Sequence, residues 1–242
     1  MLPLLYSEIT SWYWLIDPTA DHLDEATSYL AGFEQAALPQ SATLLDLGAG
    51  AGNNVFHMRK RFAACTLVDL SPDMQRLSRE LLPECEHVVG DIRSVRLGRT
   101  FDAVLVHDAI MYMASEADLR AAIETAFVHT KPGGAAIVAP DCVRETFRDE
   151  ARLLSHDEGN RSMRGIEWSW DPDPNDDVTM VEYSFLLREG TDVKAVHDRH
   201  VEGIFPRATW LRLLEGAGYR VEMIQRPLDE EGETDEVFLC RR

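Results

Sequence analysis

Two hydrophobic patterns alternate along the chain between residues 43 and 141. Short apolar runs, typical of buried strands, are TLLDL (43–47), CTLVDL (65–70), EHVVGD (86–91), FDAVLVHD (101–108) and GGAAIVAPD (133–141). Between them lie segments with helical spacing, which are NNVFHMRKRF (53–62), SPDMQRLSRELL (71–82) and ADLRAAIETAFVHT (117–130). Strands that alternate with helices predict βαβ units on a parallel sheet, so the expected fold class is α/β with a doubly wound, Rossmann-like sheet.

Helix boundaries are marked by local signals. Residues 19–38 carry apolar side chains at alternating steps of three and four, and Pro39 ends this helix. Ser71 is in the N-cap position of the segment 71–82, and Pro72 occupies its first helical position. Both residue types favour a helix start there.

The pattern changes after Asp141. RETFRDEARLL (144–154) has helical spacing, whereas WSWDPDPNDD (168–177) contains two prolines and a run of acids that predict a loop or turn. IEWSW (166–170), VTMVEYSFLL (178–187) and KAVHDRHVEGIF (194–205) predict three strands of an antiparallel meander. A helix over 207–218 and closing strands at 219–225 and 236–242 complete the chain.

Charge narrows the possible partners. Lys and Arg number 24 against 42 Asp and Glu, which gives a formal net charge of −18. No block rich in Lys or Arg is present, so a nucleic-acid partner is not expected. A small cationic or neutral substrate suits this field, although acidity that only maintains solubility is the alternative.

Cysteine usage and hydropathy indicate the compartment. Cys65, Cys85, Cys142 and Cys240 are widely spaced with no CxxC, which predicts reduced thiols of a cytoplasmic protein and no metal site. The first ten residues, MLPLLYSEIT, lack the features of a signal peptide. No run reaches the roughly 18 apolar residues of a membrane span, so no membrane association is expected.

The stretch TLLDLGAGAGNN (43–54) carries the first chemical signal. A glycine turn that leaves a strand and opens a helix brings backbone N–H groups close to a ligand. Gly48, Gly50 and Gly52 give G-x-G-x-G, and Asn53 stands where the dinucleotide fingerprint requires its third glycine. This disfavours NAD. Asp46 before the turn is poorly placed for a pyrophosphate and suits a ligand with an ammonium group.

These motifs, in this order, resemble the class I S-adenosylmethionine-dependent methyltransferases over residues 40–140. The resemblance implies a seven-stranded methyltransferase sheet and S-adenosylmethionine as cofactor. It also implies that Asp69 holds the ribose hydroxyls, Met74 packs on adenine and Asp91 meets the adenine amino group. Alternatives are a helix-flanking acid for Asp69, a core position for Met74 and an N-cap for Asp91. The implied cofactor residues are Asp46, Gly48, Ala49, Gly50, Asn53, Asp69, Leu70, Met74, Gly90, Asp91, Ile92 and His107.

Methyl transfer is an in-line displacement, so the enzyme mainly supplies proximity and alignment. A base is needed only when the acceptor arrives protonated or as an alcohol or phenol. His107, Asp108 and Tyr112, in VHDAIMYM after the fourth strand, are the candidate catalytic residues. The alternative is that His107 hydrogen-bonds the backbone and Asp108 caps a helix or holds the cofactor.

Several residues are candidates for substrate contact. The N-terminal segment holds four aromatic residues, Tyr6, Trp12, Tyr13 and Trp14. This cluster suggests a lid, and hydrophobic anchoring of the N-terminal segment is the alternative. Strand alternation puts Asp198, His200 and Glu202 on one face of the insert. The ordinary expectation is a solvated face, and a face turned into the pocket is the alternative. The candidate substrate residues are Tyr6, Tyr13, Trp14, Asp141 and His200.

The subclass follows from motifs that are missing. HDAI stands where amino-methylating DNA enzymes carry an Asn/Asp-Pro-Pro-aromatic tetrapeptide, Asp141-Cys142 is not the Asp-Asn pair of metal-dependent catechol-type enzymes, and no Pro-Cys occurs. The insert is similar to that of antibiotic-pathway sugar N,N-dimethyltransferases, in which it covers the substrate and contributes to dimer contacts. The expected activity is methylation of a small-molecule amine by a possible homodimer. O-methylation, peptide or protein methylation, a non-catalytic S-adenosylmethionine-binding protein and an NAD(P)-dependent oxidoreductase are the alternatives.

The expected organisation is a single domain over 1–242. It comprises an N-terminal lid and helix (1–40), a cofactor-binding half (41–141), a substrate-covering insert (about 142–205) and a closing helix with strands (206–242).

Overall fold

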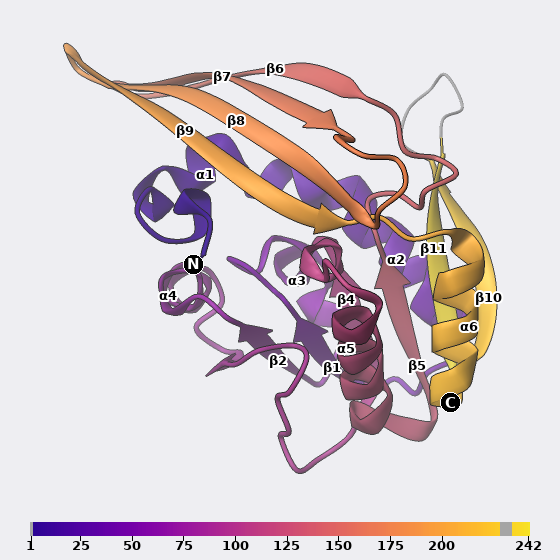
Figure 1. Ribbon diagram of the computed structural model, residues 1–242. Coiled ribbons are helices and arrows are strands. Elements are labelled where there is room, and N and C mark those ends of the chain that lie inside the picture. Colours follow the sequence, from indigo (N-terminus) through magenta and orange to yellow (C-terminus); the bar gives the residue numbers. More distant parts are fainter. Residues whose placement is uncertain (1, 228–233) are drawn as a thin grey trace.

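A seven-stranded sheet with helices on both faces forms the body of the molecule (Figure 1). The computed structural model describes residues 2–227 and 234–242. In spatial order the strands are β10 (Arg220–Pro227), β11 (Thr234–Arg241), β5 (Thr130–Ala139), β4 (Phe101–His107), β1 (Thr43–Leu47), β2 (Ala64–Asp69) and β3 (Glu86–Val89). The five strands from β5 to β3 are parallel, and β11 pairs antiparallel with both β5 and β10. The α/β prediction is therefore confirmed.

Helices enclose a hydrophobic core on each face of this sheet. The helices are α1 (Tyr13–Ile16), α2 (Leu23–Gln35), α3 (Asn53–Met58), α4 (Pro72–Leu81), α5 (Glu116–His129) and α6 (Arg207–Ala217). Short 3-10 helices are η1 (Leu4–Tyr6), η2 (Thr10–Trp12), η3 (Thr19–His22), η4 (Arg59–Arg61) and η5 (Asp108–Tyr112). Strand β1 serves both cores, because Leu45 and Leu47 pack with α5 and α6 while Leu44 packs with α2 and α3. The period of two along a strand produces this division. A third core joins the N-terminal segment, α4 and the sheet inserted after β5.

The predicted helix start at residue 72 is confirmed. The Ser71 hydroxyl accepts a hydrogen bond from the Met74 N–H at 3.2 Å, which satisfies one of the unpaired donors of the first turn. The helix predicted over 53–62 is shorter than expected, since α3 ends at Met58 and the chain continues as η4.

The segment after β5 forms a separate antiparallel sheet of four strands. These are β6 (Glu150–Glu158), β7 (Arg161–Trp170), β8 (Val178–Glu189) and β9 (Asp192–Gly203), in chain order. Two predictions are corrected here: the meander has four strands instead of three, and the helix expected over 144–154 is wrong. Residues from Glu150 onward pair with β7, with Leu153 opposite Ile166, and this pairing overrides the helical spacing.

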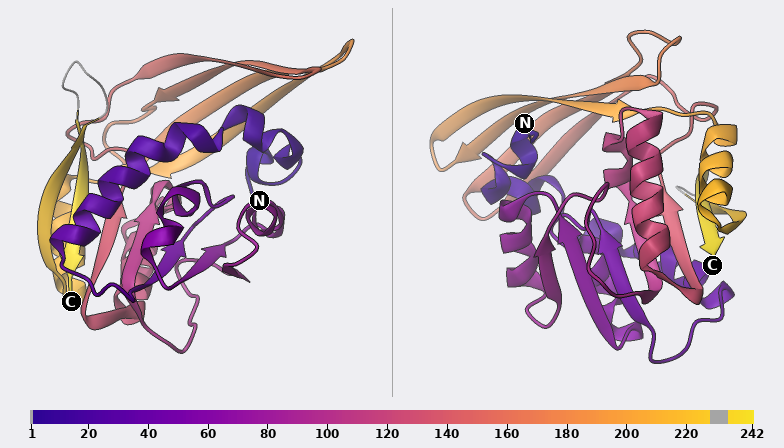
Figure 2. Two further views of the ribbon diagram at one scale, coloured as in Figure 1. Left: turned by 180° about the vertical axis from the view of Figure 1, so that it is seen from behind. Right: turned by 60° about the horizontal axis from the view of Figure 1, so that its bottom comes forward.

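The inserted sheet lies over the carboxyl ends of the parallel strands, and the N-terminal helices fill the space beneath one end of it (Figures 1 and 2). Gly203, at the end of β9, permits a close crossing over the turn after η5. A Cβ atom at this position would lie 2.1 Å from the Met113 carbonyl oxygen. The Arg161 guanidinium stacks 3.8 Å from the Trp12 ring centre and so ties β7 to the N-terminal segment. Among the described residues, no helix combines the length and the hydropathy required to span a membrane.

Candidate active site

A cavity of about 570 Å³ lies between the inserted sheet and the carboxyl ends of the parallel strands. Its wall contains Gly50 from the turn after β1, Asp69 at the end of β2, Asp108 after β4 and Asp141 after β5. Ligands of open α/β sheets bind at this edge. The N-terminal segment and strands β6 to β9 provide the opposite wall, so the cavity reaches from the glycine turn to the insert.

The three glycines of the turn have different structural roles. All three have positive φ, at 82° for Gly48, 55° for Gly50 and 87° for Gly52. A Cβ at Gly48 would lie 2.1 Å from the Ala109 side chain, and one at Gly52 would lie 2.7 Å from Leu82. These two positions therefore require glycine for packing as well as for backbone conformation. Gly50 has nothing closer than 3.7 Å and lines the cavity, which leaves room for a ligand against its backbone.

Asp69 joins the glycine turn to helix α4. Its carboxylate accepts the Gly50 N–H and the Ser71 N–H, both at 2.8 Å. Burial raises the pKa of this carboxyl above its ordinary value, and the two backbone hydrogen bonds oppose the increase. The side chain is thus held at the cavity wall by the same backbone that forms the turn.

Asp46 lies behind the turn and is 1% exposed. Among the described residues, neither of its carboxylate oxygens has a hydrogen-bond partner. Burial raises its pKa to about 7, although the positive charge of His107 acts in the opposite direction. A buried carboxylate without a hydrogen-bond partner is costly, and the positive charge of His107 offsets part of that cost.

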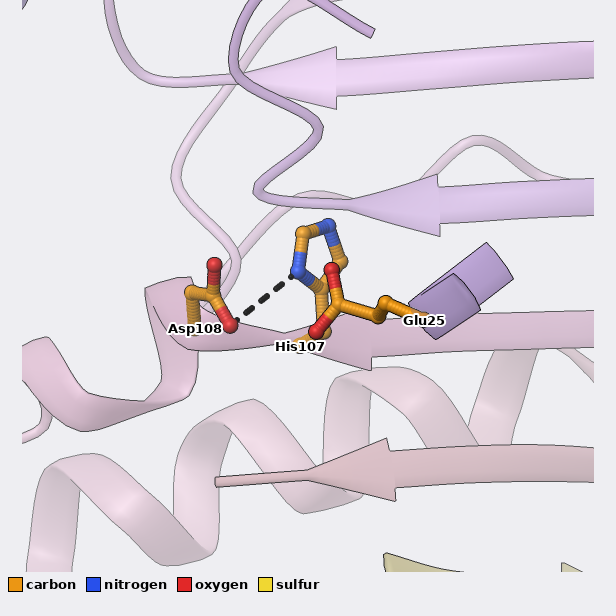
Figure 3. A group of neighbouring side chains, drawn as sticks. All are labelled: Glu25, His107 and Asp108. Atoms are coloured by element: carbon orange, nitrogen blue, oxygen red, sulfur yellow. Dashed lines mark ion pairs between the residues drawn. The ribbon is translucent and has the colours of Figure 1, made fainter. Parts of the chain in front are cut away.

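His107 and Asp108 form a pair at the end of β4 (Figure 3), with His107 Nδ1 at 3.3 Å from an Asp108 oxygen. Burial would lower the pKa of His107, but Asp108, Asp46 and Glu25 together raise it to about 10. The imidazole therefore carries a positive charge at neutral pH and does not accept a proton there. Burial opposes ionisation of Asp108, but the His107 charge holds the pKa of its carboxyl below the ordinary value.

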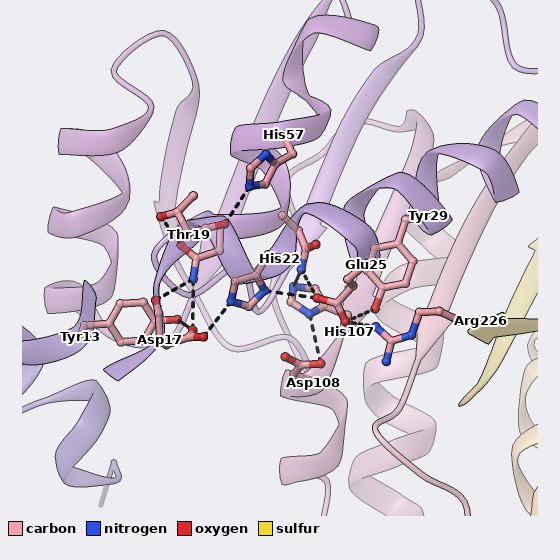
Figure 4. Close-up of polar contacts among 12 residues, drawn as sticks. Tyr13, Asp17, Thr19, His22, Glu25, Tyr29, His57, His107, Asp108 and Arg226 are labelled. Atoms are coloured by element: carbon pink, nitrogen blue, oxygen red, sulfur yellow. Dashed lines mark hydrogen bonds and ion pairs between the residues drawn. The ribbon is translucent and has the colours of Figure 1, made fainter. Parts of the chain in front are cut away.

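A polar network extends from this pair into the N-terminal segment (Figure 4). His22 lies 2.8 Å from an Asp17 oxygen and 3.3 Å from a Glu25 oxygen. Glu25 also accepts hydrogen bonds from the Tyr29 hydroxyl at 2.9 Å and from the Asn54 amide at 2.7 Å, and it pairs with Arg226. Glu25, His107 and Asp108 place possible metal ligand atoms within 4.8 Å of one another. The Glu25 oxygens are already engaged by these donors, so the group is better described as a hydrogen-bonded network than as a cation site.

Comparison with known proteins identifies the fold and the reaction class. The family described as "Methyltransferase domain" matches residues 44–134. The chain is 30% identical over 207 residues to a dTDP-3-amino-3,4,6-trideoxy-alpha-D-glucopyranose N,N-dimethyltransferase of Streptomyces venezuelae. The aligned region covers 85% of this chain and 86% of the relative.

The chain is a class I S-adenosylmethionine-dependent methyltransferase. The solved structure of Streptomyces venezuelae DesVI is similar over 98% of both chains, with a TM-score of 0.84 and 26% identity. CalS10, an amino pentose methyltransferase of Micromonospora echinaspora solved with S-adenosylmethionine bound, is similar over 91% of both chains, with a TM-score of 0.78 and 26% identity.

The methyltransferase brings most of the predicted cofactor residues to one wall of its cavity. Met74 does not line the cavity. It is 1% exposed and packs with Tyr13 and Leu77, as the core alternative expected. Asp46 and Gly90 also lie off the cavity surface, whereas Leu70 is 49% exposed and lines it. The predicted residues in the wall are Gly48, Ala49, Gly50, Asn53, Asp69, Leu70, Asp91, Ile92 and His107.

Arg93 is a wall residue that sequence reasoning missed. Its guanidinium pairs with Asp91 at 2.6 Å and with Asp118 at 3.0 Å, so the Asp91 carboxylate already has a partner. This pairing lowers the pKa of Asp91. An arginine two residues after the Gly-Asp motif was the available signal.

The predicted substrate residues divide into two groups. Tyr6, Tyr13 and Asp141 line the cavity of the methyltransferase, and the Tyr13 hydroxyl donates to Asp17 at 2.6 Å. Trp14 lies off the cavity and packs edge-on against Tyr13 at 5.5 Å between ring centres. His200 is 1% exposed and lies behind the wall.

The solvated face expected for Asp198, His200 and Glu202 is corrected. This face of β9 turns inward, because the inserted sheet covers the cavity and the N-terminal segment packs against it. Asp198 accepts the Leu5 N–H at 2.8 Å and lies 3.1 Å from His200 Nε2. Glu202 lines the cavity. Burial raises its pKa to about 7, and repulsion from Asp108 and Glu167 adds to this effect.

Proposed function

We propose that this methyltransferase transfers the methyl group of S-adenosylmethionine to the nitrogen of a small-molecule amine. The observation that carries the proposal is that one cavity joins the glycine turn to an acceptor half containing Asp108, Asp141 and Glu202. Carboxylates favour an ammonium group there. The similar Streptomyces venezuelae enzyme is named for N,N-dimethylation of an amino sugar, which supports an amine acceptor.

The residues of the turn fit the cofactor. The open backbone at Gly50 leaves space beside the turn, and Asp46, buried behind the turn, adds negative charge that suits the ammonium group of the methionine part. We assign Asp69 to the ribose hydroxyls, and Leu70 and Ile92 to the faces of adenine. When bound, S-adenosylmethionine supplies the electrophilic methyl group and a neutral thioether leaving group. The chain itself contributes alignment and the exclusion of water.

The acceptor amine must lose a proton before it attacks. His107 is replaced as candidate base, since its positive charge at neutral pH leaves it no free lone pair. We assign this role to the Tyr112 hydroxyl, which lines the cavity and lies 2.7 Å from His200 Nδ1. Tyr112 would accept the ammonium proton while its own proton passes to His200, so the relay leaves an imidazolium beside Asp198.

Three further assignments are part of the proposal. The first is the single-domain organisation set out above, of which residue 1 and residues 228–233 lie outside the described residues. The second is a homodimer through the outer face of the inserted sheet, where Leu153, Ile166 and Trp168 are 84%, 46% and 47% exposed. The third is a cytoplasmic location, which is supported by four cysteines that form no disulfide among the described residues.

The first experiment uses S-adenosylmethionine labelled in its methyl group, incubated with the protein and an extract of its source cells. Label in the small-molecule fraction that survives mild base is the expected result for an N-methyl amine. Label lost in mild base would indicate an ester, and label in protein would indicate a peptide or protein methyltransferase. Tight S-adenosylmethionine binding with no labelled product would favour the non-catalytic alternative.

A further inference from the structure

The acceptor half of the cavity is lined by carboxylates from several separate elements. Asp108 comes from η5, Asp141 follows β5, Glu167 lies on β7 and Glu202 lies on β9. Among the described residues, no other side chain forms a hydrogen bond or an ion pair with Glu167 or Glu202. Acids brought together from distant parts of the chain, inside the cavity where the acceptor must bind, indicate the charge of that acceptor.

Most basic side chains around the cavity are paired with acids, although His156, on β6, lines the wall without such a pair among the described residues. Arg93 is the one Arg or Lys side chain in the wall among the described residues, and it belongs to the cofactor half, where Asp91 and Asp118 hold it. His107 and His22 are paired with acids. Arg152 lies on β6 opposite Glu167, outside the wall, and pairs with Glu150 at 2.9 Å.

The charge of the acceptor half disfavours an acceptor that carries phosphate. The similar Streptomyces venezuelae enzyme is named for a dTDP-linked sugar, and a diphosphate needs cationic or N–H donors to offset its charge. The acceptor half of this cavity offers mainly carboxylates and the hydroxyls of Tyr6, Tyr112 and Tyr183, with His156 as an imidazole in the wall. A diphosphate there would face like charges on several sides.

We propose that the acceptor is a free amine with at least two ammonium groups and no phosphate, such as a diaminocyclitol or a short polyamine. This inference rests on the proposed amine methylation. One nitrogen would be methylated beside Tyr112, and a second ammonium group would bind the carboxylate wall of Asp141, Glu167 and Glu202. The tyrosine rings would pack on the carbon skeleton.

The raised pKa values of two carboxyl groups in the wall are consistent with this assignment. Burial, then repulsion from Asp108 and Glu202, raises the pKa of Asp141 above its ordinary value. Glu202 has a pKa of about 7. A bound cation favours the ionised form of both groups. Binding at pH 7 should therefore release protons into the buffer.

The test is calorimetric titration of the protein saturated with S-adenosylhomocysteine, in two buffers of different ionisation enthalpy. The probes are putrescine, spermidine and 2-deoxystreptamine, with cyclohexylamine as the monocation and dTDP as the nucleotide. The expected result is that at least one polycation binds tenfold or more tightly than cyclohexylamine and releases protons. Glu202→Gln should reduce both the affinity and the proton release, whereas Glu189→Gln, on the exposed end of β8, should change neither.

The opposite pattern separates the two proposals. If dTDP binds more tightly than every polycation, or no polycation exceeds cyclohexylamine, the polycationic acceptor is wrong. The labelling experiment would still support amine methylation if label enters a nucleotide-linked amino sugar. If the wild-type protein binds no S-adenosylmethionine, or transfers no methyl group to any acceptor, the proposed function itself is wrong.

Discussion

The Tyr112 hydroxyl lies 2.7 Å from Nδ1 of His200, and this contact joins η5 to the inserted sheet. Nε2 of the same imidazole lies 3.1 Å from the Asp198 carboxylate, which can only accept a hydrogen bond when ionised. Nε2 therefore carries the hydrogen, and Nδ1 is left as an acceptor for Tyr112. The Tyr6 hydroxyl, 3.0 Å from that of Tyr112, brings the N-terminal segment into the same chain of contacts.

Replacing Tyr112 by phenylalanine should lower kcat by about 10²- to 10⁴-fold, the range typical of a lost general base, with a smaller effect on KM. His200→Gln should lower kcat in the same direction because it removes the proton acceptor behind Tyr112. Steady-state rates from pH 6 to 9 measure both effects. If Tyr112→Phe retains the wild-type rate and pH profile, transfer depends on proximity alone and the relay has no catalytic role.

Asp69→Ala should weaken S-adenosylmethionine binding by about 1–3 kcal/mol, the loss expected for hydrogen bonds to a charged group. Isothermal titration measures the change. Asp73→Ala is the matched control, since Asp73 lies in the first turn of α4, outside the cavity wall. Equal affinities for Asp69→Ala and wild type would remove Asp69 from the cofactor site.

The raised pKa of His107 predicts a pH dependence of stability. Its folded pKa of about 10 exceeds the ordinary 6.5, so the folded state holds a proton that the unfolded state releases. This contribution is fully present below pH 6.5 and is lost as the pH rises through 10. Urea unfolding of the ligand-free protein between pH 6.5 and 10 should show falling stability.

His107→Gln should reduce this fall without removing it, because His22, whose pKa is also raised to about 10, contributes in the same direction. His197→Gln, on the exposed face of β9, should preserve the fall. An unchanged slope in His107→Gln would show that His107 is neutral in the folded protein, and it would restore this residue as a candidate base.

Gly203→Ala should destabilise the protein by about 1–3 kcal/mol, because the new methyl group would overlap the Met113 carbonyl oxygen. Gly216→Ala in α6 is the control, since a Cβ there meets nothing within 4 Å. That control should gain about 0.5–1 kcal/mol from helix propensity. Thermal or urea unfolding compares the two, and a neutral Gly203→Ala would mean that β9 can move away from η5.

The proposed dimer is tested by Trp168→Glu, which places a charge in the exposed apolar face of β7. Trp168 stacks on Trp170 at 5.6 Å between ring centres, so the change also divides an aromatic pair. Sedimentation should show a dimer for the wild type and a monomer for the variant. Glu158→Gln, at the exposed end of β6, should leave the dimer intact. A monomeric wild type would contradict the assignment.

Short-range sequence signals were sufficient to predict much of the cofactor-binding half. The alternation of strands and helices, the Ser71 cap and the glycine turn depend on residues near one another in the chain, so sequence alone predicted them. The close contact of Gly48 with Ala109 was not predictable in the same way, because the two residues are 61 positions apart in the sequence. Met74 shows a similar limit, since whether a methionine meets a ligand or the core depends on what packs around it.

The sequence by itself determined the α/β order, the G-x-G-x-G turn and an acidic chain without a basic block, because each is a property of composition or short-range spacing. Only the tertiary structure decided that residues 150–154 form a strand, because their hydrogen-bond partners lie on β7. It also decided which face of β9 is covered and that His107 is charged, because Asp46, Asp108 and Glu25 surround it from three elements. Burial and long-range electrostatics depend on such neighbours, and the fold alone brings them together.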